Sequence, residues 1–191
     1  MSRSERPPQR PRMPRVRPDG QFDVTVTFLE MAERPARPLL HPPQGLKLTL
    51  IRSERPPLHF YRYLYDTIGH DWYWIERKRL SDKALAAIVQ HPEVHIYLLL
   101  LAGVPAGFAE IDFRRLPDQA ALSYFGLMAA FQGRGLGRYF LDWSVDAAWS
   151  RGPRKVVLNT CDLDHPGALA LYQKCGFVPV SQKQIVFDPV P

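Results

Sequence analysis

The sequence has few cysteines, no long uninterrupted apolar run and no internal repeat. Its two cysteines, Cys161 and Cys175, are too few for a disulfide scaffold and lack a metal-ligand spacing, so we expect free thiols and no metal. The most apolar stretch, 96–109, is interrupted by glycine and proline and is too short to cross a bilayer as a helix. These absences favour a cytoplasmic protein with no membrane segment.

Excess positive charge is concentrated in the first twenty residues. This segment holds six arginines against Glu5 and Asp19, whereas the whole chain of 191 residues has a net charge of +6. It also holds five prolines and few apolar side chains, so it cannot bury enough surface to offset the entropy lost on ordering. We expect a disordered tail over 1–20, without a secretory signal, and one domain over 21–191. Basicity confined to a tail argues against a nucleic-acid-binding protein.

Apolar periodicity divides this domain into strands and helices. Strict alternation predicts a strand over 23–29, in an N-terminal extension at about 21–45, and another over 46–51. Helical spacing predicts helices over 57–68 and 81–90, with Ser81 as the N-cap of the second. The remaining expected order is strands at 94–101, 106–113 and 120–128, a helix ending near Ser150, a strand at 155–160, a helix at 166–174, and strands at 177–180 and 183–187.

A glycine-rich segment, Gln132-Gly-Arg-Gly-Leu-Gly137, follows a predicted strand and begins a predicted helix. Such a loop lets the backbone approach a phosphate, which the free first-turn amides and the helix dipole then stabilise. A nucleotide P-loop is excluded because Gly137 is followed by Arg138, not lysine. A dinucleotide fingerprint is excluded because its third glycine would fall on Arg138 or Phe140. On the helix that follows, Arg138, Asp142 and Asp146 share a face that we expect to meet solvent.

Two segments together resemble one enzyme superfamily. Gln132, Gly135 and Gly137 match the Gln/Arg-x-x-Gly-x-Gly/Ala pattern of the GNAT superfamily of N-acetyltransferases. The segment 168–177, Ala-Leu-Ala-Leu-Tyr-Gln-Lys-Cys-Gly-Phe, is similar to the superfamily's Ala-x-x-Leu-Tyr-x-x-x-Gly-Phe motif. The resemblance implies an α/β (mixed α+β) acyl-CoA N-acyltransferase fold, with a largely antiparallel mixed sheet splayed between its fourth and fifth strands and flanked by helices.

The same resemblance implies acetyl-CoA as co-substrate and assigns residues to it. The pantetheine arm would bond like an extra strand to the backbone of Leu127 and Met128. The diphosphate would lie on the glycine loop, whose residues are Gln132, Gly133, Arg134, Gly135, Leu136, Gly137 and Arg138. The superfamily often has asparagine where this chain has His165, so His165 either donates a hydrogen bond to the pantetheine or belongs only to a turn capped by Asp164.

Acetyl transfer to an amine needs a neutral nucleophile and a proton for the departing thiolate. Tyr172 lies where the superfamily's tyrosine commonly protonates the sulfur of coenzyme A; its alternative role is packing and a cofactor hydrogen bond. Glu110 is the candidate general base, on a strand whose carboxylates face away from Ala109 and Ile111. Cys161 as an acylated nucleophile is a further alternative, although the superfamily usually transfers directly.

Aromatic side chains are dense between residues 60 and 74. Trp72, Tyr73 and Trp74 could line the acceptor site, although part of this cluster should be core. The sequence therefore predicts transfer of an acetyl group to a primary amine of a small molecule or peptide. A catalytically idle acyl-CoA-binding regulatory module is the alternative, and the sequence leaves a homodimer open.

Overall fold

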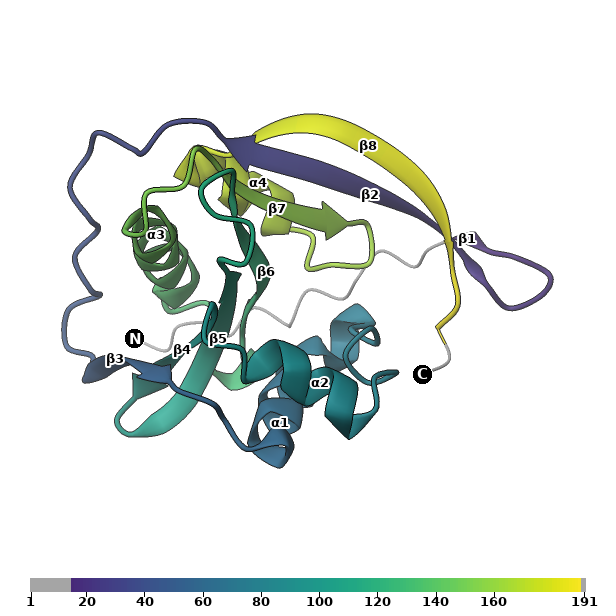
Figure 1. The fold of residues 1–191 in the computed structure, drawn as a ribbon, viewed down its shortest axis with the longest axis horizontal. Helices are drawn as coiled ribbons and strands as arrows, with labels where there is room; N and C mark the ends of the chain where they lie inside the picture. Colours follow the sequence, from purple (N-terminus) through teal and green to yellow (C-terminus); the bar gives the residue numbers. More distant parts are fainter. Residues whose placement is uncertain (1–14, 190–191) are drawn as a thin grey trace, which may run out of the picture.

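The computed structural model describes residues 15–189, which form one mixed sheet with helices on both faces (Figure 1). The strands are β1 (Arg15–Val16), β2 (Phe22–Met31), β3 (Leu48–Ser53), β4 (Val94–Leu101), β5 (Val104–Asp112), β6 (Ala120–Leu127), β7 (Val156–Cys161) and β8 (Val178–Phe187). The helices are α1 (Leu58–Gly69), α2 (Asp82–Val89), α3 (Leu136–Trp149) and α4 (Ala168–Cys175), with short 3-10 turns η1 (His70–Trp72) and η2 (Ala129–Phe131). The strand order is β1-β2-β7-β6-β5-β4-β3, and β8 pairs with β2.

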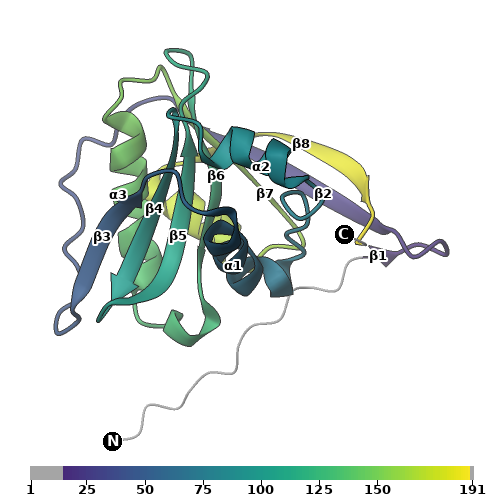
Figure 2. The same ribbon diagram turned by 60° about the horizontal axis from the view of Figure 1, so that its bottom comes forward.

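Helices α3 and α4 cover one face of this sheet and α1 and α2 cover the other (Figure 2), and a hydrophobic core lies under each pair. Alternation along β5 supplies both: Ala109 and Ile111 belong to the core under α3 and α4, whereas Phe108 belongs to the core under α1 and α2. Because both faces of β4 are covered, this strand is apolar along most of its length. The predicted Ser81 cap is confirmed, since its side chain accepts a hydrogen bond from the Ala84 amide. No helix within residues 15–189 combines the length and apolarity needed to span a bilayer.

The sheet is splayed between β6 and β7. These two strands run parallel and pair only at Ala120 with Val156 and at Ala121 with Val157, whereas the other pairs are antiparallel. Beyond Ala121 the two strands separate, which leaves one edge of each without its neighbour. The predicted fold, a largely antiparallel mixed sheet opened between these strands, is confirmed.

The two ends of the chain differ from the predictions. Residues 1–14 of the expected disordered tail lie outside the described residues, but 15–20 are ordered: Val16 pairs with Phe22 and a turn passes through Gly20. The two strands predicted at 177–180 and 183–187 are one strand, β8, which pairs with β2 from Phe22 to Glu30. The residues between the two predicted strands, Ser181 and Gln182, continue the same edge strand with exposed side chains.

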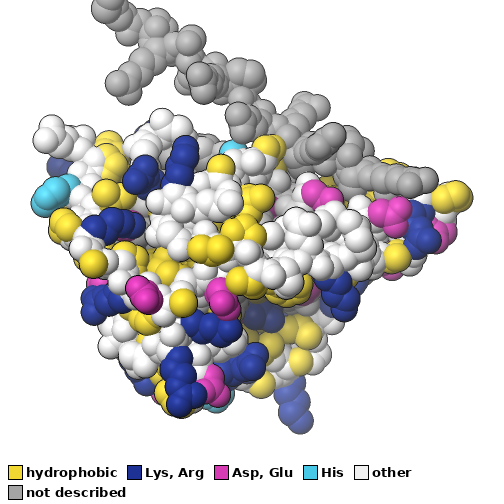
Figure 3. Space-filling view, turned by 90° about the horizontal axis from the view of Figure 1, so that it is seen from above, with side chains coloured by type: hydrophobic (Ala, Val, Ile, Leu, Met, Phe, Trp, Pro, Cys, Tyr) yellow, Lys and Arg dark blue, Asp and Glu magenta, His cyan; other side chains and the backbone are white. Residues whose placement is uncertain are grey.

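Strand β8 forms an outer edge of the sheet and carries three exposed valines, Val178, Val180 and Val186. Seen from above, hydrophobic side chains lie in small groups among polar atoms and charged side chains (Figure 3). The homodimer that the sequence leaves open stays a prediction.

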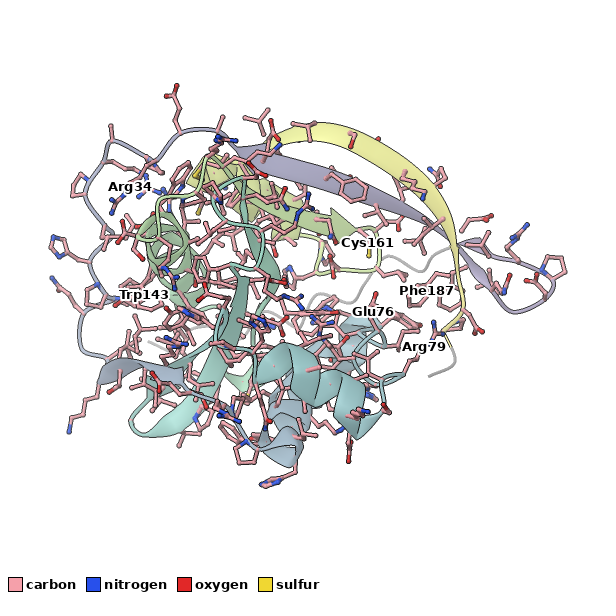
Figure 4. The ribbon with its side chains drawn as sticks, in the orientation of Figure 1. Arg34, Glu76, Arg79, Trp143, Cys161 and Phe187 are labelled. Carbon is pink, nitrogen blue, oxygen red and sulfur yellow. The ribbon has the colours of Figure 1, made fainter. Side chains whose placement is uncertain are left out.

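The long connection from β2 to β3 runs along α3 and is bound to it by carboxylates. Asp142 is 4% exposed; its Oδ2 accepts a hydrogen bond from the Leu40 amide at 2.8 Å, and its Oδ1 pairs with Arg37. Arg34 pairs with Asp146 one turn later, and Figure 4 shows Arg34 beside α3. The expectation that Asp142 faces solvent is therefore wrong, because a segment distant in sequence covers it.

We expect Asp142→Ala to lower the free energy of unfolding by about 2 kcal/mol and the melting temperature by about 4–8 °C, because it removes a charged acceptor from two donors. Asp146→Ala is the matched control, since its pair with Arg34 is half exposed and should contribute less than about 1 kcal/mol. Urea denaturation of both variants measures the difference. Equal losses would contradict the buried role of Asp142.

Candidate functional site

A cavity of about 710 Å³ opens where β6 and β7 separate. One wall is the edge of β6 from Leu122 to Leu127, and the opposite wall contains Asn159 and Cys161 of β7. The start of α3 and the exposed turns of α4 border one end of the cavity. The other end is bordered by residues 72–76 and by the side chains of β2 and β8.

The glycine loop before α3 has the geometry of an anion site. Gly133 and Gly135 have φ angles of +74° and +77°, a region that side chains with a Cβ rarely adopt. The first three amides of α3, from Leu136 to Arg138, precede the first intrahelical donor, which is the Tyr139 amide bonded to Gly135. These amides and the helix dipole together favour a negatively charged group at this end of the cavity.

The backbone of β6 offers a strand edge to the cavity at Leu127. Leu127 is paired with Gly107 of β5, and the Met128 amide donates to the Ala106 carbonyl at 2.9 Å. In an antiparallel ladder this pattern makes Leu127 and Gly107 a pair without mutual hydrogen bonds, so the amide and carbonyl of Leu127 point away from β5. Gln132 Nε2 donates to the Leu127 carbonyl at 3.3 Å, which joins the glycine loop to this edge.

Several residues predicted to bind the cofactor line this cavity: Leu127, Gln132, Gly133, Gly137, His165 and Tyr172. Met128 does not line it, because its amide donates to Ala106 and its carbonyl accepts from Phe131. Gly135 is the N-cap of α3 and Leu136 is fully buried in the core. Arg134 and Arg138 are exposed beside the loop, where their charges can act on an anion.

Tyr172 enters the cavity from α4 next to a buried carboxyl. Its ring packs on Phe177 and its side chain is 8% exposed. Burial, followed by the charge of Asp164, raises the pKa of the Tyr172 hydroxyl well above its usual value. Asp164 accepts from Thr160 Oγ1 at 2.7 Å and from the Cys161 amide at 2.9 Å, and burial raises its pKa. The Tyr172 hydroxyl therefore stays protonated at neutral pH and can donate a proton into the cavity.

His165 lies in a turn and also lines the cavity, so the two roles left open by the sequence both stay predictions. Its Nδ1 accepts from the Gly167 amide at 3.0 Å, and Asp164 caps the preceding turn. Burial lowers the pKa of His165, so the neutral ring carries its proton on Nε2. The imidazole also packs edge-on against Trp72, with ring centroids 5.1 Å apart. Since His165 lines the cavity, its Nε2 is a candidate donor.

Trp72, Tyr73 and Trp74 come together on one wall of the cavity. Tyr73 has a φ of 56°, unusual for a residue with a side chain, and it lies edge-on to Phe22 at 5.3 Å and to Phe187 at 6.5 Å. Trp74 packs on Tyr124 at 5.1 Å. The aromatic wall therefore joins the segment after α1 to the ends of β2 and β8.

Glu110 is fully buried under this wall and does not line the cavity. Its Oε1 accepts from Arg77 at 2.6 Å and its Oε2 accepts from the Tyr61 hydroxyl at 2.6 Å. The Arg77 guanidinium also lies over the Tyr124 ring, 5.0 Å from its centroid. The strand places Glu110 in the layer opposite Ala109, as expected, but both of its carboxylate oxygens are already engaged.

Two features of the cavity were not found from the sequence. Glu76 lines it, and its Oε2 accepts from the Tyr65 hydroxyl at 3.2 Å. Val24, Val26, Ile185 and Phe187 line it from β2 and β8. Figure 4 shows Glu76, Cys161 and Phe187, from three distant segments, on the same side of the molecule. Cys161 is a poor nucleophile here, because burial and then the charge of Asp164 raise its pKa to about 12.

Comparison with known proteins identifies similar sequences and folds. The sequence model of the Acetyltransferase (GNAT) family matches residues 58–177. An uncharacterized N-acetyltransferase of Methanocaldococcus jannaschii is 23% identical over 123 residues, which cover 62% of this chain and 53% of that protein. The mycothiol acetyltransferase of Corynebacterium glutamicum is 32% identical over 72 residues, covering 38% of this chain and 24% of that enzyme.

Solved structures share the fold. A GCN5-related N-acetyltransferase from Sphaerobacter thermophilus aligns with a TM-score of 0.63 and 18% identity, over 88% of this chain and 52% of that one. The chain therefore spans about half the length of this structure and of the Methanocaldococcus relative. The match extends beyond the two sequence motifs to the splayed sheet that carries them.

Proposed function

Because the chain belongs to the acetyltransferase (GNAT) family, we propose that it moves an acetyl group from acetyl-CoA to a primary amine of a small molecule or peptide by direct transfer. The observation that carries this proposal is one cavity bordered by the strand edge at Leu127, by the glycine loop and by Tyr172. A cytoplasmic location, expected from the sequence, stays part of the proposal.

The residues present fit acetyl-CoA at one end of the cavity. The edge of Leu127 would bond the amides of the pantetheine arm as an added strand, and His165 Nε2 would donate to the same arm. The first amides of α3 would hold the diphosphate, with Arg134 and Arg138 adding positive charge beside the loop. Met128 is left out because its backbone groups already have partners.

Acetyl-CoA supplies an activated acetyl thioester, and the protein's residues control the proton transfers. The ammonium form of the acceptor first loses one proton to solvent and becomes nucleophilic. As the C–N bond forms and the C–S bond breaks, the nitrogen loses a second proton. Tyr172 gives its hydroxyl proton to the thiolate sulfur and is restored by a proton derived from the amine. Its raised pKa keeps this hydroxyl protonated at neutral pH, so the proton is present when the sulfur leaves.

The base role predicted for Glu110 requires it to release Arg77 or Tyr61 first. We propose that Glu110 instead positions Arg77 under the aromatic wall. Deprotonation then takes place in the open part of the cavity, through water.

Binding of acetyl-CoA should stabilise the protein by about 2.7 kcal/mol at a hundredfold excess over the dissociation constant, a rise in melting temperature of about 5–10 °C. The measurement is a melting scan with acetyl-CoA, followed by coenzyme A release against amino acids, polyamines, aminoglycosides, arylalkylamines and peptides. No shift in melting temperature would refute the cofactor. A shift without turnover of any amine would favour the idle acyl-CoA-binding module.

A further inference from the structure

The end of the cavity away from the glycine loop has a composition that specifies its ligand. We call this end the acceptor chamber; it is formed by Trp72, Tyr73, Trp74, Glu76, Asp164 and Phe187. Among the described residues that line the whole cavity, Asp, Glu, Lys and Arg occur only at Glu76, Asp164 and Lys174. Lys174 lies one helical turn after Leu171, which approaches Gly137, so its charge belongs to the diphosphate end. Both carboxyl groups therefore lie in the acceptor chamber.

Glu76 is the carboxylate of this chamber that no cation neutralises. The three residues that follow it are basic, yet each has another partner: Arg77 pairs with Glu110, Lys78 with Asp66, and Arg79 donates to the Asp188 carbonyl. Within residues 15–189 no ion pair includes Glu76, and its hydrogen bond from Tyr65 occupies one oxygen. Burial, followed by the charge of Glu76, raises the pKa of Tyr124 to about 12, and burial is the main cause of the raised pKa of Asp164, to which Glu76 adds.

The rest of the chamber is apolar or aromatic. Trp72 and Trp74 present indole rings, and Phe187 closes the outer side with Val24 and Ile185. Aromatic faces attract ammonium groups and apolar bodies, but they do nothing to stabilise a carboxylate. A ligand carboxylate placed here would meet the exposed carboxylate of Glu76 without an opposing cation, which disfavours it by repulsion.

From this arrangement we propose that the acceptor is a primary amine, bound as its ammonium form. The amine is attached to an aromatic or branched apolar group and has no carboxylate next to it. Glu76 is the specificity-determining residue, because its free oxygen pairs with the ammonium. This inference rests on the proposed acetyltransferase function and adds the substrate class to it. Free amino acids are excluded by the same charge that attracts the corresponding amines.

The test compares each amine with the amino acid that differs from it by one carboxylate: tryptamine with tryptophan, and phenethylamine with phenylalanine. We expect kcat/KM for the amines to exceed that for the amino acids by about 10- to 100-fold. This is the change in rate constant expected when one charge-assisted hydrogen bond is lost or is opposed by a like charge. In Glu76→Gln we expect this preference to fall below about threefold, mainly through a higher KM for the amine. Calorimetric binding of tryptamine to the protein saturated with coenzyme A should weaken by a similar factor.

Asp118→Asn is the control, since Asp118 is an exposed carboxylate paired with Arg154 outside the cavity and should leave every constant unchanged. Amino acids accepted as well as the amines would overturn the proposal, as would an unchanged preference in Glu76→Gln. In both cases a retained acetyl-CoA melting shift and measurable turnover would leave the acetyltransferase function intact. Loss of that shift in the wild-type protein would instead refute the function itself.

Discussion

Replacing Tyr172 with Phe should lower kcat by about 100-fold while leaving the acetyl-CoA melting shift nearly unchanged. The substitution removes only the hydroxyl, so the ring still packs on Phe177 and the wall of the cavity is kept. Without a positioned acid, the sulfur must leave as a thiolate or take its proton from water. The loss should therefore appear in kcat rather than in the binding of acetyl-CoA.

Two comparisons make this result specific to Tyr172. Tyr63→Phe, on the exposed side of α1, removes a hydroxyl from a side chain that is 49% exposed and should leave kcat unchanged. Thioesters whose thiols are more acidic need less protonation, so they should recover part of the rate in Tyr172→Phe but not in the wild type. A kcat within threefold of the wild type would leave Tyr172 only a packing role.

The cofactor half of the site was predictable because its signals are local. Gly133 and Gly135 are needed for their φ angles, and together with Gly137 they appear as a motif within six residues. Tyr172 lies in a second compact segment. Five residues predicted for the cofactor do not line the cavity: Met128, Arg134, Gly135, Leu136 and Arg138. For Met128 the reason is the strand register that engages its amide with Ala106, which depends on β5 and cannot be read from residues 127–128 alone.

Of the proposed acceptor half only the aromatic residues 72–74 were predicted, because contacts between distant segments form the rest. Glu76 precedes three basic residues and has the appearance of a solvated charge; only the partners of Arg77, Lys78 and Arg79 show that it is left unpaired in the cavity. Likewise β2 and β8 alternate like ordinary strands. The topology of the sheet pairs these two strands with each other, and this pairing places Val24 and Phe187 in one wall of the cavity.

The same dependence on distant partners applies to Glu110, for which Glu110→Ala should be the most destabilising single change considered for this protein. It leaves the Arg77 guanidinium, whose side chain is 16% exposed, without a counter-charge, and it leaves the Tyr61 hydroxyl without its acceptor. Removing one partner of a buried ion pair costs about 3–5 kcal/mol, or about 6–20 °C in melting temperature for a chain of this length. Asp118→Ala, which breaks the exposed pair with Arg154, should cost less than about 1 kcal/mol in urea denaturation.

Two further variants separate the structural role of Glu110 from the base role predicted for it. The double variant Arg77→Met with Glu110→Leu removes both charges and should recover most of the stability lost in Glu110→Ala, because no charge stays buried alone. Glu110→Gln keeps an acceptor for Tyr61 but cannot take up a proton at neutral pH. If Glu110 positions Arg77, this variant should keep kcat within about tenfold of the wild type once corrected for the folded fraction. A loss of 100-fold or more in folded Glu110→Gln would instead assign the base to Glu110, because general bases contribute about 10²–10⁴-fold.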